Sequence, residues 1–268
     1  MAVETNFIEG VAVRTTGSGP AVVLLHANGG DHRDFDAVLG HLADRYTVHA
    51  LDWPGWGDSP AGTQPSAVGY AEVLTRLLGE LSDGPFVLVG NSVGGFAAIR
   101  AAAQRPDLVR SIVLVDPGGF TPRWLGSVVA CRAVGSARLA PMMMRTLPRL
   151  YLRRRGAWVD EVRARAVRSS TDQRLVDAFR AVWQSFAHPD HDAQDAAESL
   201  SLPTLLIWGR RDPVLPWPVD GRRARRALGH AEVVALPCGH QAHVEMPHEF
   251  LEVVERFLEP LRTDSGWR

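Results

Sequence analysis

A serine lies at the centre of a glycine-rich segment, Gly90-Asn91-Ser92-Val93-Gly94-Gly95. This G-x-S-x-G segment follows the apolar run 86–89 and precedes a helical pattern over residues 96–104. A turn from strand to helix is so tight at such a segment that the serine backbone is strained and small residues must flank it. The turn also places the hydroxyl above the N-terminus of the helix, which favours developing negative charge. We therefore predict that Ser92 is a nucleophile, the alternative being a plain strand-to-helix turn.

Two further residues have the chemistry to activate this serine. A hydroxyl is a poor nucleophile at neutral pH and needs a base, which in turn needs a carboxylate to orient it. Asp212 follows the apolar run 204–208, and His240 follows the run 232–236. We predict that Asp212 is the orienting acid and that His240 is the base.

Other residues near these positions offer alternatives. His243 lies shortly after His240 and could be the base, and Asp116 directly follows the apolar run 111–115 and could be the acid. Cys238 also lies near the predicted base, where we expect a buried, inert thiol rather than a nucleophile. The segment His188-Pro189-Asp190-His191-Asp192 has the residue types of a metal site, but its spacing is weak evidence. We expect a solvated loop there and no metal.

Short apolar runs alternate with longer helical patterns along the chain. Runs this apolar are typical of strands that are covered on both faces, as in a parallel sheet. The runs span residues 21–25, 46–51, 86–89, 111–115, 204–208 and 232–236, and the helical patterns span 35–42, 68–81, 96–104, 219–228 and 248–261. This alternation predicts an α/β fold with a doubly wound, mostly parallel sheet. Ligands bind outside the carboxyl ends of such strands, where Ser92, Asp212 and His240 all lie.

Residues 120–200 interrupt the alternation. They contain helical and irregular patterns broken by Pro141, Pro148 and Pro189, with no good strand. Such a stretch is too long for an ordinary loop. We predict that 120–200 form a helical cap, inserted into a core made of residues 1–119 and 201–268.

The predicted cap differs in charge from the rest of the chain. Residues 120–185 contain 13 arginines and only four acids, whereas the formal net charge of the whole chain is −1. A solvated arginine-rich helix face is one interpretation. The other is that the cap attracts an anionic substrate, carrier or lipid surface.

Further segments resemble those of a known family. Asp52-Trp53-Pro54-Gly55-Trp56-Gly57-Asp58-Ser59 resembles a D-x-P-G-x-G-x-S loop, and His240 with Glu245-Met246-Pro247 resembles a G-H-x(4)-E-x-P segment. With the order Ser92, Asp212, His240, the chain resembles the α/β-hydrolase superfamily from about residue 20 to 261.

The resemblance implies a role for each residue. Ser92 would attack a carbonyl carbon, His240 would move the proton, and Asp212 would hold the imidazole tautomer. The backbone N–H groups of Val93 and Asn28 would form the oxyanion hole. Family members usually have His-Gly before the Asn28 position, whereas this chain has His-Ala.

The substrate pocket is less defined by sequence. We expect Trp53, Trp56, Asn91 and Met143 to line it. The segment around Asn91 also resembles the nucleophile turn of C–C bond hydrolases that act on meta-cleavage products. Their usual Gly-Pro-Gly oxyanion loop is absent, and Gln241 replaces the tryptophan that follows their histidine.

Composition limits the remaining possibilities. All 29 basic residues are arginine, which excludes Schiff-base catalysis, lysine-anchored pyridoxal phosphate and a P-loop. We expect no cofactor and no nucleic-acid partner. The two cysteines, Cys131 and Cys238, do not make a disulfide framework, and residues 1–6 do not resemble a secretory signal. No apolar run is long enough for a transmembrane segment, so we expect a cytoplasmic location; the oligomeric state is left open.

These observations favour a serine esterase without a cofactor. The predicted reaction is hydrolysis of a small-molecule carboxylic ester or thioester through an acyl-enzyme on Ser92, and the arginine-rich cap offers an anionic substrate as one interpretation. A C–C bond hydrolase is the alternative within the same mechanism. An alternative from another class is a ligand-binding protein, cyclase or lyase that keeps the fold without hydrolytic chemistry.

Overall fold

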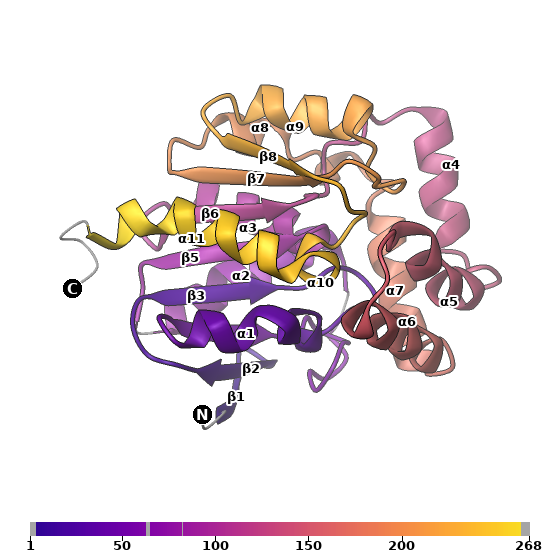
Figure 1. Cartoon of the computed structure of the whole chain (residues 1–268). Helices are drawn as coiled ribbons and strands as arrows, with labels where there is room; N and C mark the ends of the chain where they lie inside the picture. The colour runs from indigo at the N-terminus through magenta and orange to yellow at the C-terminus, as the bar shows by residue number, and fades with distance from the viewer. Residues whose placement is uncertain (1–3, 63–64, 82, 264–268) are drawn as a thin grey trace.

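A single eight-stranded sheet forms the centre of the molecule. The computed structural model describes residues 4–62, 65–81 and 83–263, so the ends of the expected core, 1–3 and 264–268, lie outside the described residues. The strand order is β1-β2-β4-β3-β5-β6-β7-β8, with β1 and β2 antiparallel at one edge and the others parallel (Figure 1). The strands are β1 (Glu4–Ile8), β2 (Val11–Thr16), β3 (Ala21–Leu25), β4 (Thr47–Leu51), β5 (Phe86–Asn91), β6 (Val109–Val115), β7 (Thr204–Gly209) and β8 (Glu232–Leu236).

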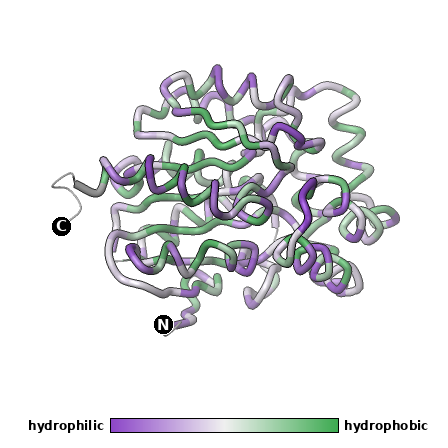
Figure 2. Tube along the Cα trace, in the orientation of Figure 1, coloured by the Kyte–Doolittle hydropathy of each residue, from purple (hydrophilic) through white to green (hydrophobic). Residues whose placement is uncertain are grey.

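Helices cover both faces of the sheet, which explains why its central strands are mostly apolar. In β3, Val22 and Leu24 pack into one hydrophobic cluster, and Val23 and Leu25 pack into the other. All four side chains are fully buried. Figure 2 shows the same contrast, with hydrophobic strands between helices of mixed polarity. The predicted α/β fold with a doubly wound, mostly parallel sheet is confirmed.

The helices of the core flank the strands that the sequence predicts. One face carries α1 (Asp36–Ala43) and α11 (Pro247–Thr263), and the other carries α2 (Ala67–Glu80), α3 (Val93–Gln104) and α9 (Arg222–Ala227). The single helix expected over 219–228 is two elements, a π-helical turn at Trp217–Gly221 and then α9. Two 3₁₀ turns, His32–Phe35 and Pro189–His191, and the short helix α10 (Ala242–Glu245) lie between the larger elements.

The antiparallel hairpin β1–β2 was not predicted from the sequence. β1 is an exposed edge strand, so it lacks the apolar run that indicates a buried one. Its turn residues Glu9 and Gly10 both have positive φ, 52° and 74°. Positive φ at both central positions is the conformation of a two-residue hairpin turn. The sequence signal that could have indicated this hairpin is the two-residue turn Glu9-Gly10, which has glycine at its second position.

Four helices form a group beside the carboxyl ends of the strands: α4 (Leu125–Val134), α5 (Ala140–Tyr151), α6 (Ala157–Ser169) and α7 (Gln173–Ser185) (Figure 1). A fifth, α8 (Gln194–Glu198), packs on α3 and α9 instead. No strand lies within residues 120–200, all of which are described. The division into a core and a cap at 119/120 and 200/201 stays a prediction. In the part of the chain that the structure covers, no helix combines the length and apolar character needed to cross a membrane.

Candidate active site

The backbone of Ser92 is strained, with φ 55° and ψ −114°. Close packing around the glycines on both sides of Ser92 holds the turn in this conformation. A Cβ on Gly90 would lie 2.5 Å from the carbonyl oxygen of Gly94, and a Cβ on Gly94 would lie 2.2 Å from that of Leu25. The Ser92 N–H donates to the carbonyl of Val115 at 3.1 Å, which fixes the turn to β6. Strain of this kind persists only where surrounding packing over-determines it, and it is typical of functional sites.

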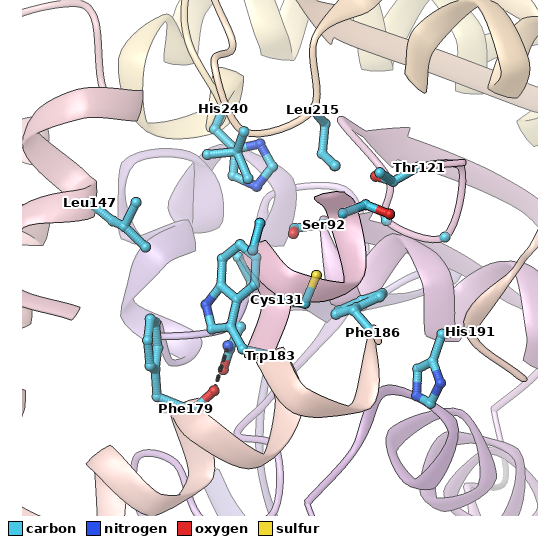
Figure 3. Close-up of a pocket in the computed structure, with 18 of the residues that line it drawn as sticks. Ser92, Thr121, Cys131, Leu147, Phe179, Trp183, Phe186, His191, Leu215 and His240 are labelled. Carbon is cyan, nitrogen blue, oxygen red and sulfur yellow. Dashed lines mark hydrogen bonds between the residues drawn. The ribbon is translucent and has the colours of Figure 1, made fainter. Parts of the chain in front are cut away.

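Asp212 and His240 form a short hydrogen bond next to this turn. His240 Nδ1 lies 2.6 Å from Asp212 Oδ2, and their side chains are only 5% and 0% exposed. The Val214 N–H donates to the other carboxylate oxygen at 2.7 Å, so Asp212 is held on both sides. Because Nδ1 donates to the carboxylate, Nε2 of the neutral ring is an acceptor. Ser92 and His240 face the same cavity (Figure 3).

The loop of His240 is held by the carboxylate of Glu245 and by the end of α5. Glu245 Oε1 accepts the Gly239 N–H at 2.9 Å, and Oε2 accepts the N–H groups of residues 153 and 154. The His240 N–H donates to the carbonyl of Tyr151 at 3.1 Å. A Cβ on Gly239 would lie 1.7 Å from that carbonyl, so only glycine fits. Helix α5 and the histidine loop therefore position each other.

Asp116, the alternative acid, is a buried neighbour of the pair. Carboxylate oxygens of Asp116 and Asp212 and a ring nitrogen of His240 all lie within 4.8 Å of one another. Asp116 Oδ1 accepts the N–H of Gly209 at 2.9 Å. Burial and then the charge of Asp212 raise the pKa of Asp116 well above its ordinary value. Asp212, and not Asp116, has the direct bond to His240.

His243, the alternative base, does not reach the cavity. Its ring is fully buried and stacks on Phe35 at a centroid distance of 4.6 Å. Neither ring nitrogen has a hydrogen-bond partner among the described residues. Burial and then the nearby charge of His240 lower the pKa of His243 to about 3. The ring is thus a neutral core residue and not a proton carrier.

This buried histidine makes stability depend on pH. A histidine with a lowered pKa in the folded state contributes fully above its unfolded pKa of about 6.5, and the contribution is lost as the pH falls toward 3. When unfolding takes up one proton, the free energy of unfolding changes by about 1.4 kcal/mol per pH unit. We expect His243→Leu to flatten the loss of unfolding free energy between pH 6.5 and 4 by about that slope. Urea unfolding at several pH values measures it, and equal m-values in the two proteins are the control. Parallel pH profiles would contradict this account.

A cavity of about 420 Å³ lies between the strand ends and helices α4–α7. Ser92 and His240 lie at its inner end, and Figure 3 shows Leu147, Phe179, Trp183 and Phe186 around the space beside them. Most of the lining is apolar, and besides Ser92, Tyr151 and His240 its polar side chains are Asn28, Thr121, Arg123, Ser127, His188, His191 and Asp192. A mostly apolar pocket with a few polar groups is the usual form of a small-molecule site.

The four predicted pocket residues do not line this cavity. Trp53 and Trp56 are 0% and 2% exposed and pack around Tyr70, the first by ring stacking at 4.8 Å and the second by a hydrogen bond. Asn91 is buried and donates to backbone carbonyls, as described below. On α5 the adjacent Met144, not Met143, lines the wall, because consecutive helix positions point in different directions. The prediction for these four residues is wrong.

Asn91 joins the nucleophile turn to the histidine loop. Its Nδ2 donates to the carbonyls of Val115 and His240, both at 2.9 Å. The amide thereby links the ends of β5, β6 and β8. These two hydrogen bonds explain why an asparagine precedes Ser92, and the explanation does not require Asn91 to contact a substrate.

Both predicted oxyanion donors lie at the cavity end that holds Ser92. Val93 begins α3 directly after the serine, and Asn28 lines the cavity in the loop after β3. The side chain of Asn28 donates to the carbonyl of Phe179 on α7 at 3.2 Å, the bond dashed in Figure 3. The backbone N–H groups are the groups that could meet an oxyanion.

Two minor candidates also have structural explanations. Cys238 is fully buried, and burial followed by the charges of neighbouring acids raises the pKa of its thiol, which makes it inert. His191 was expected in a solvated loop but is only 8% exposed. It lines the cavity and stacks on Phe96 at 5.8 Å. Burial and then the charge of His188 lower the pKa of His191 to about 4.

Arg165 on α6 ties the cap helices to the core. Its side chain is 5% exposed, donates to Asp34 in a short contact, and has Nε 3.5 Å from Asp31 Oδ2. Burial opposes ionisation of Asp31, but the hydrogen bond from Arg33 and the charge of Arg165 hold its pKa below its ordinary value. Gln241 Nε2 lies 3.5 Å from the other Asp34 oxygen, so the network reaches the residue after His240.

We expect Arg165→Met to lower the free energy of unfolding by about 3–5 kcal/mol, because it leaves the buried Asp34 carboxylate without its cation, while Asp31 keeps its pair with Arg33. The matched control is Arg168→Met on the same helix, whose ion pair with Glu161 is more than half exposed. Exposed pairs contribute about 0–1 kcal/mol. Urea unfolding measures both variants. Equal losses in the two would contradict a cap–core tie at Arg165.

Comparison with known proteins places the chain in a family. Residues 20–247 match the model of the alpha/beta hydrolase fold family. The chain is 29% identical over 255 residues to the pimeloyl-[acyl-carrier protein] methyl ester esterase of Aeromonas hydrophila subsp. hydrophila, covering 92% of this chain and 99% of that protein. It is 29% identical to the sn-1-specific diacylglycerol lipase of Mus musculus, covering 89% of this chain and 81% of that protein.

Solved structures share the fold. A membrane phospholipase A, described as a bacterial virulence factor, matches with a TM-score of 0.78 and 27% identity over 98% of this chain and 87% of that one. A thermophilic esterase from Thermogutta terrifontis matches with a TM-score of 0.83 and 21% identity over 98% of this chain and all of that one. The resemblance read from the motifs is thus confirmed, and the chain belongs to the α/β-hydrolase fold family.

Proposed function

We propose that this protein is a serine hydrolase that cleaves a carboxylic ester of a small molecule through an acyl-enzyme on Ser92. The observation that carries the proposal is the buried Asp212–His240 hydrogen bond of 2.6 Å beside the strained turn of Ser92, at the inner end of an apolar cavity. Relatives named as esterases and a lipase support an ester as the substrate.

The proposed reaction has two halves. Ser92 Oγ attacks the carbonyl carbon while His240 Nε2 takes the hydroxyl proton, and Asp212 stabilises the imidazolium that forms. The oxyanion is met by the backbone N–H groups of Val93 and Asn28. The intermediate collapses, His240 returns the proton to the alkoxide, and the alcohol leaves. Water then attacks the acyl-enzyme by the same route, which releases the acid and restores Ser92.

The cavity supports an apolar substrate of moderate size. Its volume of about 420 Å³ lies within the ~300–1,000 Å³ range of small-molecule sites. Arg123 is the only arginine among the described lining residues, so an anionic substrate stays a prediction. Thioester cleavage and the cytoplasmic location also stay predictions. Because Asn91 binds only backbone, no observation here favours C–C bond cleavage over ester hydrolysis.

Fluorophosphonate labelling tests the proposal. The native protein is incubated with the probe, digested, and analysed by mass spectrometry to locate the adduct. We expect a single adduct on Ser92, with heat-denatured protein unlabelled as the control. A panel of 4-nitrophenyl esters of increasing acyl length then gives kcat/KM. Absence of the adduct, or labelling of another serine, would refute the serine mechanism and favour a non-hydrolytic use of the fold.

A further inference from the structure

The outer face of helices α4 and α5 combines exposed apolar side chains with arginine. On α4, Leu125, Val129 and Arg132 share one exposed side at helical spacing, and Trp124 adjoins them. Trp124, Leu125 and Val129 are 65%, 79% and 55% exposed. No residue of α4 is buried. Large apolar side chains that are exposed together mark an interaction surface.

Helix α5 repeats the arrangement. Met142, Arg145 and Arg149 lie on one exposed side at i, i+3 and i+7, and Met142 is 52% exposed. Helices α4 and α5 contact each other, and Figure 1 shows both on the side of the molecule where the strands have their carboxyl ends. We call the exposed residues Trp124, Leu125, Val129, Arg132, Met142, Arg145 and Arg149 the rim patch.

The charge of this region is one-sided. Residues 120–159 contain eight arginines and no aspartate or glutamate. None of the eight forms an ion pair with an acid in the ranges that the structure covers. Arginines that are not neutralised by the protein itself remain available to an external anion.

The opposite faces of the same helices line the cavity. Ser127, Ala130 and Cys131 do so from α4, and Met144 and Leu147 do so from α5. Each helix therefore separates the cavity from the outer surface by its own thickness.

We propose that the rim patch docks this protein on an anionic phospholipid surface. Tryptophan and aliphatic side chains insert into the headgroup region, while arginines attract the anionic headgroups, as in interfacial amphipathic helices. An acidic protein could also contact tryptophan and arginine, but large apolar side chains at helical spacing beside arginines are the pattern of helices that lie on anionic lipid, and the test below separates the two partners. The docking does not depend on hydrolysis, so it goes beyond the proposed function.

Vesicle co-sedimentation tests the docking. The Ser92→Ala protein is used so that no lipid is cleaved, with vesicles of phosphatidylcholine alone or mixed with phosphatidylglycerol. We expect binding to the anionic vesicles that weakens with salt. We expect Arg145→Gln/Arg149→Gln to weaken it about thirtyfold, at about 1 kcal/mol per lost arginine, and Trp124→Ser/Leu125→Ser to weaken it about tenfold.

Matched controls lie far from the patch. Arg225→Gln/Arg226→Gln removes the same charge from exposed positions of α9, and Phe7→Ser removes an apolar side chain that is 63% exposed on β1. Both should bind like the parent. With Ser92 restored, all variants should keep turnover of a short soluble ester, which checks folding.

Three outcomes would overturn the docking. They are no binding to anionic vesicles, equal loss in the control variants, or binding to a purified acidic acyl carrier protein with none to vesicles. Vesicle binding by a protein without ester turnover would refute the proposed function alone. A parent protein that turns over esters but does not bind anionic vesicles would refute this inference alone.

Discussion

Replacing Ser92 by alanine is expected to lower kcat toward a 4-nitrophenyl ester by about 10⁶-fold, since the nucleophile of a serine triad contributes on that order. The substitution keeps a small residue in the turn, where glycines lie on both sides. KM should change little, because the cavity walls are untouched. Steady-state kinetics and fluorophosphonate labelling of the same preparation measure the effect.

The control for this variant is its stability, because a loss of activity must not come from unfolding of the turn. Alanine is as strained as serine at φ 55°, so Ser92→Ala should unfold at nearly the same urea concentration as the parent. A variant that is folded but retains more than about one hundredth of the activity would show that the ester is cleaved without a covalent serine step. Solvent attack directed by His240 would then be the mechanism to examine.

The sheet could be predicted because its central strands are buried on both faces. Burial on both faces imposes an unbroken apolar sequence, and this signal is visible in β3 and β6 without any tertiary information. The edge hairpin β1–β2 has no such constraint. β1 is exposed at nearly every position, so its residues are chosen by local turn geometry and solubility.

The positions of Ser92, Asp212 and His240 were predictable for a different reason. Each follows a parallel strand, and parallel strands bring their carboxyl ends to one edge. Strand position alone does not separate Asp212 from Asp116 or His240 from His243, because all four lie after strands, and the sequence favoured Asp212 and His240 through their match to the family's motifs. The contacts in the structure distinguish these residues. Asp212 lies 2.6 Å from His240, whereas His243 stacks on Phe35.

The lining of the cavity was the least predictable part. It is built from four helices that meet across more than fifty residues of sequence, and their rotation about their own axes decides which side chains face inward. Met143 and Met144 illustrate this, since one helix position separates a lining residue from its neighbour. Glu245 belonged to a recognised motif, but its bonds to residues 153 and 154 have no sequence signal. The same holds for the contact between Arg165 and Asp34.

Asp212→Asn is expected to lower kcat by about 10⁴-fold with little change in KM. An asparagine amide can present its NH₂ group to Nδ1 of His240, which then accepts and leaves the proton on Nε2. The ring in that tautomer cannot take the proton of Ser92. The pH dependence of kcat, with fluorophosphonate labelling rates beside it, measures the loss.

Asp116 makes the second half of this prediction specific to this protein. Part of what raises the pKa of Asp116 is the charge of Asp212, so Asp212→Asn should lower that pKa and let Asp116 ionise as the pH rises. The residual activity of Asp212→Asn should therefore increase with pH, and the increase should vanish in Asp212→Asn/Asp116→Asn. Asp116→Asn alone keeps an oxygen for the N–H of Gly209 and should lose less than about tenfold. If Asp116→Asn loses as much as Asp212→Asn, the two carboxyl groups act as one unit, and Asp212 is not the sole orienting acid.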